Sequence, residues 1–500
     1  MEVYKIHLGP AKCAMDLGDG SERGEYVNQD YILAKLGRPH RNINLMYCYY
    51  PLDQGWPARA SEIATDSKVV YAWDYAYDDY FPYQGGIGGS TEGEPFRCMR
   101  DIRRHGQDVT LTLTIDCATP DEHLVQIARE LKPFGRMHLR INHEATGTWF
   151  AFNKRYSYQE VADFFVRFHR IIKQEAPQIQ TILCIGGKGK GEMTEMPYEQ
   201  EFTEAIQTAD IWSGDYYLAL HWGWPYDVAE TGGNSHKRMT VDEVYEINRW
   251  SLDRFVKCNQ GHVKPLVISE FNADGDVTGP YEQAEMIRDF YLKLKAESAT
   301  WLTGVTFYQF RDRGRLALEI EDPNHVESGI EQPVLAVYRK IIHDSYFMPS
   351  LSLRKPVTFP ARLRWGSFED SDGLAIPISL SQNPVFCEVT FEDCGLNLIL
   401  EFNGWWFYKK PGVKTIDLMP AFYQKPLKKP KKLIFKMFAP PAMGENDPSQ
   451  GADWAINYYT VIHQLPEFRI RYQPIETEYY KPVSAENQSE ETKPEEDLIG

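Results

Sequence analysis

The sequence lacks the segments that would place the chain in or across a membrane. No run approaches the roughly 18 consecutive apolar residues that a spanning helix needs. The first seven residues, MEVYKIH, contain no basic stretch followed by an apolar segment, so they do not resemble a signal peptide. We therefore expect a cytoplasmic protein, with a secreted mature form as the alternative.

Metal and nucleotide motifs are also lacking. The eight cysteines are scattered, without a CxxC pair or a Cys/His spacing typical of a metal site. The segment 186–191 (GGKGKG) does not have the GxxxxGK[ST] spacing of a phosphate-binding loop. We expect a flexible loop there rather than a nucleotide site.

Positive charge is in deficit, with 54 Lys and Arg against 71 Asp and Glu and a net charge of −17. This balance argues against general binding to nucleic acid or to anionic membranes, which needs clustered Lys and Arg. The apolar fraction of 43% and the charged fraction of 25% are those of a globular protein. Because 500 residues exceed what a single core supports, we expect at least two domains.

Strand-like runs alternate with helical patterns through residues 43–343. The runs are 42–50, 68–75, 108–115, 136–143, 180–186, 209–217, 264–270 and 302–310. Capping boxes at Ser157/Glu160, Thr240/Glu243 and Thr119/Glu122 mark the starts of intervening helices. Eight such units predict a (β/α)8 TIM barrel, an α/β fold whose active sites lie at the carboxyl ends of the strands. The alternative is a doubly wound sheet, but the glycine-rich turn typical of its first strand is missing.

The remaining segments predict three further parts. Residues 1–42 form an N-terminal extension that caps the barrel or adds a loop to it. Residues 344–483, with strands at 385–391, 396–402, 432–438 and 468–472, predict a C-terminal β-sandwich-like accessory domain. The polar, acidic residues 484–500 predict a disordered tail. In the accessory domain, we expect Trp405 and Trp406 to lie in the core or at the contact with the barrel, and the lysines of 425–432 to flank a strand in solvent.

Two carboxylates stand at predicted strand ends. Glu144 ends the fourth strand (RINHE), and Glu270 ends the seventh (ISEFN). Hydrolysis of a glycosidic bond needs such a pair, because one carboxylic acid protonates the leaving oxygen while the other attacks or activates water. A separation of about 5–5.5 Å retains the anomeric configuration, whereas about 6.5–9.5 Å inverts it.

This pattern resembles the clan A glycoside hydrolases, which are retaining enzymes, and locally it is most similar to the family 26 endo-mannanase group. The resemblance rests on His143-Glu144 followed by residues 147–150 (GTWF), on residues 214–217 (GDYY), and on Lys264-Pro265 ahead of Ile268-Ser269-Glu270. It covers residues 43–310. It implies that Glu144 is the general acid/base, that Glu270 is the nucleophile, that Tyr217 bonds to the nucleophile, and that no cofactor is needed. Clan members often have Trp at the end of strand eight, where this chain has Tyr308.

Other residues near the strand ends are candidates for binding or orienting a sugar. Arg140 is expected to hold Glu270 or Glu144 in place. Side-chain alternation puts Asn142 on the face of Arg140 and Glu144, so His143 needs a local twist to reach the site. We predict aromatic platforms for sugar rings at Trp73, Trp149, Trp222 and Tyr308, although aromatic residues that only pack the fold give the same pattern. Asp215 binds hydroxyls or caps a turn.

The predicted partner is an oligo- or polysaccharide resembling β-mannan, β-glucan or xylan, and no oligomeric state is implied. An anionic glycan is the alternative hypothesis, suggested by four cations after strands five and eight: Lys188, Lys190, Arg311 and Arg313. Two other functions stay open. One is a metal-dependent barrel hydrolase using His143, Glu144 and His221, although residues 47–50 (YCYY) lack the His-x-His of such enzymes. The other is a non-catalytic glycan-binding protein.

Overall fold

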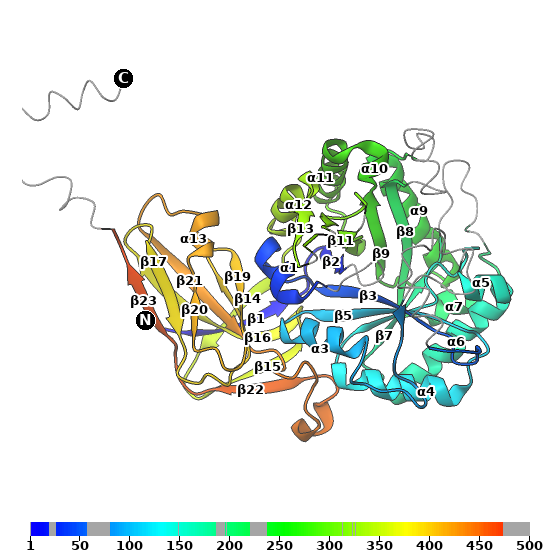
Figure 1. Ribbon diagram of the computed structural model, residues 1–500, viewed down its shortest axis with the longest axis horizontal. Helices are drawn as coiled ribbons and strands as arrows, with labels where there is room; N and C mark the ends of the chain where they lie inside the picture. Colours follow the sequence, from blue (N-terminus) through cyan, green and yellow to red (C-terminus); the bar gives the residue numbers. More distant parts are fainter. Residues whose placement is uncertain are drawn as a thin grey trace, which may run out of the picture.

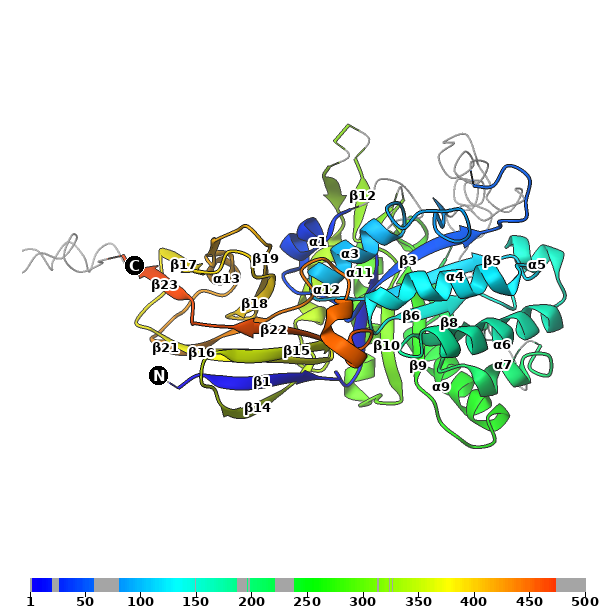
Figure 2. The same ribbon diagram turned by 90° about the horizontal axis from the view of Figure 1, so that it is seen from below.

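The chain folds into a barrel and a β-rich accessory domain that lie side by side (Figures 1 and 2). The computed structural model describes residues 2–19, 27–57, 81–148, 150–186, 196, 198–220, 238–312, 314–322, 324–325 and 327–473. Among these residues, no helix is both long enough and apolar enough to cross a membrane.

Eight parallel strands close into the predicted barrel. In order around it they are β2 (Ala14–Gly18), β3 (Asn42–Tyr49), β5 (Asp108–Ile115), β6 (His138–Ile141), β7 (Gln180–Cys184), β8 (Ile211–Ala219), β9 (Leu266–Ala273) and β10 (Leu302–Phe307). Strand β2 closes the ring, because it pairs with β10 on one side and with β3 on the other. The two-residue strand β4 (Phe81–Pro82) adds to the end of β3.

Helices surround these strands (Figure 1). The longer ones are α1 (Gln29–Leu36), α3 (Phe96–Arg104), α4 (Asp121–Leu131), α6 (Tyr158–Glu175), α9 (Val241–Cys258), α11 (Pro280–Ala296) and α12 (Pro333–Ile342). The shorter ones are η2 (Lys132–Phe134), α5 (Ala151–Arg155), α7 (Thr203–Thr208) and α10 (Gly275–Thr278). A small sheet of β11 (Arg311–Asp312), β12 (Glu319–Glu321) and β13 (Gly329–Glu331) follows β10.

Two of the three predicted helix caps are confirmed. Ser157 and Thr240 cap α6 and α9, and in both helices the third residue returns a side-chain bond to the cap. The capping box predicted at Thr119 is wrong. Helix α4 begins at Asp121 after Pro120, without a side-chain cap, and Thr119 is buried.

The first barrel strand differs from the prediction. Residues 42–50 were expected to begin the barrel, but the short run Ala14–Gly18 precedes them as strand one. The run 68–75, predicted as strand two, lies outside the described residues, and β3 pairs directly with β5 along its whole length. Because one strand is gained ahead of β3, the fourth and seventh strands keep their predicted positions.

The accessory domain consists of two antiparallel sheets. The larger contains β1 (Tyr4–Gly9), β14 (Ser350–Pro356), β15 (Ala361–Ser367), β16 (Asp370–Leu380), β18 (Leu398–Phe402), β19 (Trp405–Lys409), β21 (Lys431–Phe438) and β22 (Tyr458–Ile462). The smaller contains β17 (Phe386–Thr390), β20 (Thr415–Asp417) and β23 (Glu467–Arg471). Two short helices, α13 (Pro420–Gln424) and η4 (Pro448–Asp453), complete it. Apolar residues of both sheets share one core, as in the predicted sandwich.

Residues 1–42 do not form the separate N-terminal extension that was predicted. Strand β1 pairs with β14 and β16, so the chain starts in the accessory domain and enters the barrel at β2. Its apolar side chains Ile6 and Leu8 are buried, which explains why this strand needs a partner sheet.

The accessory domain contacts the amino-terminal ends of the barrel strands. Asp108, the first residue of β5, accepts a hydrogen bond of 3.0 Å from the backbone of Phe368. Arg136, two residues before β6, forms an ion pair with Asp370. The carboxyl ends of the strands, where barrel enzymes bind substrate, are therefore left clear of this contact.

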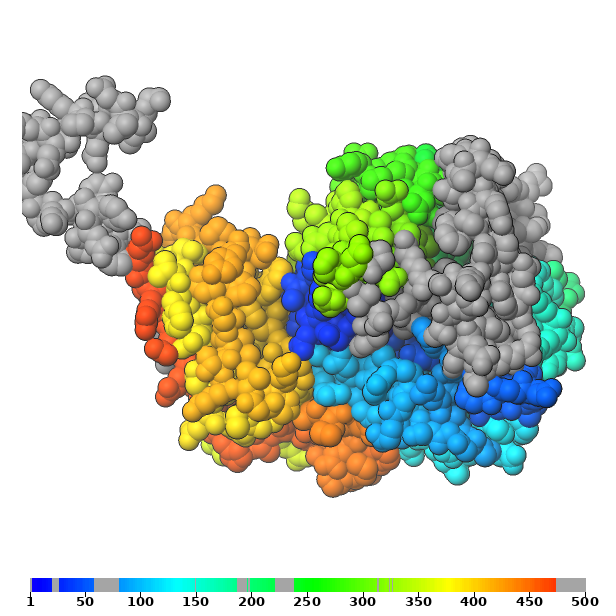
Figure 3. Space-filling view, viewed as in Figure 1, coloured from blue at the N-terminus to red at the C-terminus, as the bar shows by residue number. Residues whose placement is uncertain are grey.

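The tandem tryptophans dock the two parts together, as predicted. The backbone N–H of Trp406 donates to Gly37 at the end of α1 over 2.8 Å, and its ring stacks on Phe438. The ring of Trp405 stacks on His343 and covers Gly37. Both tryptophans are buried, so neither forms a carbohydrate-binding surface. In the space-filling view the N-terminal blue residues lie between the two parts (Figure 3).

Replacing Gly37 with Ala should loosen this contact. Gly37 has a φ of +74°, and an added Cβ would lie 2.3 Å from the Trp405 ring. We expect a loss of about 2–5 kcal/mol, because backbone strain and overpacking add. Gly412→Ala is the matched control, since Gly412 has a φ of +88° but open space, so it should lose only about 1–2 kcal/mol. Thermal unfolding of both variants measures the difference, and equal losses would contradict the docking role.

Candidate functional site

A buried arginine organises the carboxyl ends of the strands. Arg140, on β6, has no exposed side-chain surface. Its Nε donates to Thr112 Oγ1 of β5 over 2.7 Å, and its Nη2 donates to Glu270 Oε1 over 3.1 Å. Its Nη1 lies 3.5 Å from Asp215 Oδ1. The predicted contact between Arg140 and Glu270 is therefore present.

The chain twists where β6 ends. Asn142 and Glu144 have φ values of 53° and 48°, in the left-handed region that non-glycine residues rarely adopt. These two residues flank His143 and turn its ring into the barrel, which confirms the predicted twist. Strain of this kind, of order 1–3 kcal/mol per residue, is typical of functional sites.

The placement of Asn142 by strand alternation is wrong, because the twist interrupts the alternation. Its side-chain oxygen accepts a 2.7 Å hydrogen bond from the backbone of Ile115, and its amide nitrogen lies toward Cys117. Among the described residues, the hydrogen bonds of its side chain thus go to the end of β5 rather than to either glutamate. Its predicted role in orienting substrate stays a prediction.

His143 brings the two predicted catalytic carboxylates together. Its Nε2 lies 3.1 Å from Glu270 Oε1 and 3.8 Å from Glu144 Oε2. These two distances limit the gap between the carboxylate oxygens to about 7 Å, which admits the retaining separation and excludes most of the inverting range. Glu144 is the more open of the two, with a quarter of its side chain exposed, whereas Glu270 is buried.

A tyrosine from the neighbouring strand β8 contacts Glu270, and further aromatic rings pack around this contact. Tyr217, on β8, donates a 2.8 Å hydrogen bond to Glu270 Oε2, the contact that the family resemblance implies. Tyr308 follows β10, and its ring lies edge-on to Tyr217 with centroids 6.1 Å apart. Phe150 packs edge-on against the His143 ring. Tyr217 therefore hydrogen-bonds the nucleophile candidate, and aromatic rings pack against both Tyr217 and His143, the two neighbours of Glu270.

The charges in this site oppose ionisation of Glu270. Burial raises the pKa of Glu270 well above its ordinary value, and the charges of Asp215 and Glu144 raise it further, against Arg140 and Tyr217. Burial also raises the pKa of Asp215. Burial and the Arg140 charge hold the pKa of His143 well below its ordinary value, so its ring is neutral. Because Asp215 and Glu270 share one guanidinium and Glu144 adds a third negative charge beside Glu270, a proton is readily retained among the carboxylates.

Asp215 stands behind His143 and is held by residues that sequence reasoning missed. Its Oδ2 lies 3.3 Å from His143 Nδ1 and accepts from the Cys184 thiol, while its Oδ1 accepts a 2.9 Å bond from Ser269. Thr112, which binds Arg140, was missed as well. Their positions on barrel strands, with side chains alternating toward the interior, were the available signal.

His143, Cys184 and Asp215 also form a potential metal-binding group, with ligand atoms within 4.8 Å of one another. Two features oppose a cation there. The Arg140 guanidinium already lies against Asp215, and burial raises the pKa of the Cys184 thiol well above its ordinary value, so the thiolate that a metal needs is disfavoured. The group fits a hydrogen-bonded support for Glu270 better than a metal site.

Several predicted residues lie outside the described part of the chain. They are Trp73, Trp149, Trp222, His221, Lys188, Lys190 and Arg313. Arg311 is described, and it is buried with its Nε donating 2.7 Å to Glu319 and its guanidinium over the Tyr31 ring. The predicted role of Arg311 in attracting an anionic glycan is wrong, because Glu319 neutralises its charge.

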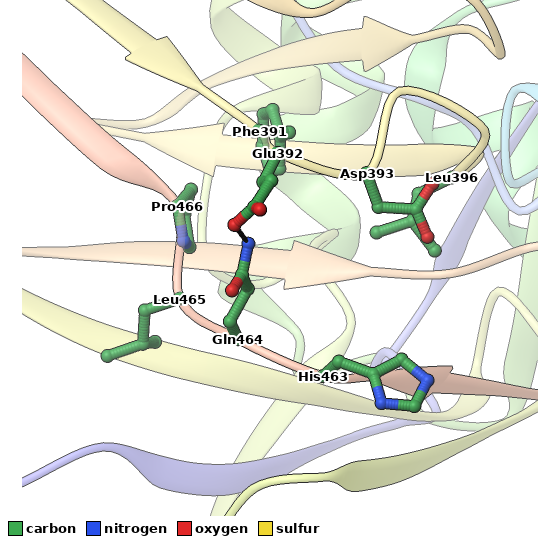
Figure 4. Close-up of a pocket in the computed structure, with 8 residues that line it drawn as sticks. All are labelled: Phe391, Glu392, Asp393, Leu396, His463, Gln464, Leu465 and Pro466. Carbon is green, nitrogen blue, oxygen red and sulfur yellow. Dashed lines mark hydrogen bonds between the residues drawn. The ribbon is translucent and has the colours of Figure 1, made fainter.

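A surface pocket of about 290 Å³ lies in the accessory domain (Figure 4). It is lined by Phe391, Glu392, Asp393, Leu396, His463, Gln464, Leu465 and Pro466. Glu392 accepts a hydrogen bond from Gln464 across it. None of the predicted site residues contributes to this pocket.

Comparisons with known proteins find relatives only by structure. No family model and no curated protein matches the chain. A modular family 26 endo-β-1,4-mannanase from Cellulomonas fimi has 11% identity and a TM-score of 0.42, covering 90% of this chain and 93% of its own. A family 51 α-L-arabinofuranosidase from Bifidobacterium longum has 11% identity and a TM-score of 0.41, covering 86% and 97%. A GH26 β-mannanase from Bacteroides ovatus has 9% identity and a TM-score of 0.39, covering 67% and 89%.

Glu270→Gln should stabilise the protein at neutral pH. Because the pKa of Glu270 is raised on folding, its contribution to the free energy of unfolding falls as the pH rises from the unfolded-state pKa through the folded one. The neutral amide avoids this loss, so we expect a gain of about 0.5–2 kcal/mol that is larger at pH 8 than at pH 5. Thermal unfolding across pH measures it.

Glu319→Gln is the control for this measurement. Glu319 is also buried but is bound to Arg311, so removing its charge breaks a buried ion pair and should lower stability. If the thermal unfolding midpoint of Glu270→Gln were lower than that of wild type at every pH, the unfavourable ionisation of buried Glu270 would be contradicted.

Proposed function

We propose that the protein is a retaining glycoside hydrolase that cleaves β-glycosidic bonds of an oligo- or polysaccharide. Glu270 is the nucleophile and Glu144 the general acid/base. The observation that carries the proposal is the meeting of these two carboxylates, from strands four and seven, at one nitrogen of His143. The clan A resemblance assigns the same two roles to the same two residues.

In the first step, ionised Glu270 attacks the anomeric carbon and forms a glycosyl ester, while Glu144 gives its proton to the departing oxygen. In the second step, Glu144 takes a proton from water, which hydrolyses the ester. Repulsion between the two carboxylates keeps a proton in the pair at the start. Esterification of Glu270 removes its charge, so Glu144 then ionises readily and acts as a base.

The neighbouring residues position these groups. Tyr217 and Arg140 stabilise ionised Glu270 and aim its two oxygens. Asp215, held by Ser269, lies 3.3 Å from Nδ1 of His143, opposite the nitrogen that approaches Glu270. The clan A resemblance expects a sugar-stacking tryptophan at the end of strand eight, and Tyr308 takes that position in this sequence. The substrate class is a β-mannan, β-glucan, xylan or anionic glycan.

Loss of either carboxylate should abolish turnover. A panel of β-mannans, β-glucans, xylans and uronate- or sulfate-bearing glycans is assayed for reducing-sugar release. We expect Glu144→Gln to lose about 10²–10⁴-fold in kcat, because general acid catalysis is lost. Glu270→Gln should lose at least as much, because no glycosyl ester forms.

Glu204→Gln is the control for this assay, because Glu204 is an exposed carboxylate paired with Arg170. The turnover of this variant should equal that of wild type. Activity that survives in Glu270→Gln would refute the nucleophile. Binding of a glycan without turnover by the wild type would favour the non-catalytic alternative, and loss of turnover on chelation would favour the metal-dependent one.

Tyr217→Phe should move the acid limb of the pH profile of kcat/KM to higher pH. Glu270 must be ionised to attack, and the Tyr217 hydrogen bond lowers the pKa of that carboxyl, so its loss raises the pKa. We also expect about a tenfold or greater loss in kcat/KM at neutral pH, the worth of a hydrogen bond to a charged group. Tyr216→Phe is the matched control, because the Tyr216 hydroxyl bonds to Ser251 instead. Equal pH profiles for the two variants would contradict the role of Tyr217.

A further inference from the structure

Five lysines stand together at one edge of the accessory domain. Lys425, Lys428 and Lys429 lie in the segment that joins α13 to β21, and Lys431 and Lys432 begin β21. All five are exposed, and among the described residues none forms an ion pair with a carboxylate. The basic run was predicted as a solvated strand flank, and its exposure agrees with that prediction.

The lack of carboxylate partners distinguishes this cluster from nearby cations. On the same strand Lys436 pairs with Glu401, and Arg469 of β23 pairs with Glu388. The chain as a whole carries an excess of 17 negative charges, so acidic partners are not scarce. Five cations within eight residues therefore produce a local positive potential on an acidic protein, which attracts a polyanion to this position.

The segment that carries the lysines is anchored at several points. The side chain of Asn403 donates to the Lys425 carbonyl over 2.8 Å, and the N–H of Leu427 donates to Asn383 over 2.8 Å. Pro426 and Pro430 restrict the backbone between these points. Little backbone entropy is therefore lost when a partner binds. Tyr423, directly before the segment, is 72% exposed and offers an aromatic face.

The lysines lie far from the barrel mouth. Strand β16 meets the barrel at Asp370, and its other end, Leu380, pairs with Lys431. Its eleven residues span about 33 Å at about 3.3 Å per residue. Since the accessory domain contacts the amino-terminal ends of the barrel strands, a ligand on the lysines leaves the carboxyl ends open (Figure 2).

We propose that this lysine cluster is a docking site for a polysaccharide bearing carboxylate or sulfate groups. The choice of a glycan rests on the function proposed for the barrel, and the choice of an anionic one rests on five cations that pair with no carboxylate in the described part of the chain. Lysine ammonium groups act as point charges without the directional fork of arginine, which suits repeated charges along a flexible polymer. Tyr423 adds a surface for the apolar face of a sugar ring. The cluster tethers the enzyme to the polymer while the mouth stays free to cleave.

The test compares binding of the full-length protein to polygalacturonate, dextran sulfate and neutral dextran at low salt. Wild type should bind the two anionic polymers, bind neutral dextran at least tenfold more weakly, and lose affinity as salt screens the charges. The triple variant Lys425→Gln, Lys428→Gln, Lys429→Gln should bind the anionic polymers at least tenfold more weakly than wild type. The control triple Lys257→Gln, Lys340→Gln, Lys414→Gln removes the same charge from exposed positions elsewhere and should bind like wild type.

Binding is measured separately from turnover, so the two proposals fail separately. Glu270→Gln should bind the anionic polymers as wild type does, even if the barrel cleaves a different glycan or none. Equal weakening in the two triple variants would overturn the docking site, because net charge alone would then explain binding. No binding by wild type, equal binding of neutral dextran, or tighter binding to phosphatidylserine vesicles or duplex DNA would also overturn it.

Discussion

The parallel closure of the barrel is the constraint on which the site depends. Strand β2 pairs with both β3 and β10, so no strand edge is left and all eight carboxyl ends meet at one mouth. Arg140 on strand four, Asp215 on strand six and Glu270 on strand seven are far apart in the sequence, yet closure brings their side chains within hydrogen-bonding or ion-pairing distance. Without it, the arginine would be a buried charge with no partner, at a cost of several kcal/mol.

The site that closure creates holds more negative than positive groups. Arg140 is the one cation that contacts Glu270 within the described part of the site, and His143 is kept neutral by burial and by that same arginine. This imbalance costs stability, but it leaves a proton available among the carboxylates. A glycosidase needs that property, because one carboxyl group must start protonated while its neighbour is ionised. The left-handed conformations of Asn142 and Glu144 are a second local cost that serves the same geometry.

The accessory domain shares the chain without competing for the mouth. Its first strand is the N-terminal segment, and its contact with the barrel buries Trp405 and Trp406 against α1. The two parts therefore form one continuous structure, in which the barrel mouth and the lysine cluster point to different regions of the surface. Under the two proposals, a polymer bound at the lysine cluster is cleaved at the barrel mouth, and the tethering raises the local concentration of bonds to be cut.

The sequence by itself determined the barrel, the sandwich-like domain and the positions of Glu144 and Glu270 at the ends of strands four and seven. Hydrophobic periodicity and strand-end motifs are local properties of the chain, so they can be read without the tertiary structure. It did not reveal strand one, since five residues (AMDLG) carry too little periodicity to stand out. It also misplaced Asn142, because alternation holds only while φ stays extended, and the turn at β6 depends on how His143 packs inside the closed barrel. Arg311 was misread for a related reason, as its partner Glu319 was not recognised. Only the tertiary structure decided these points, since charge pairing and side-chain direction depend on contacts between distant segments.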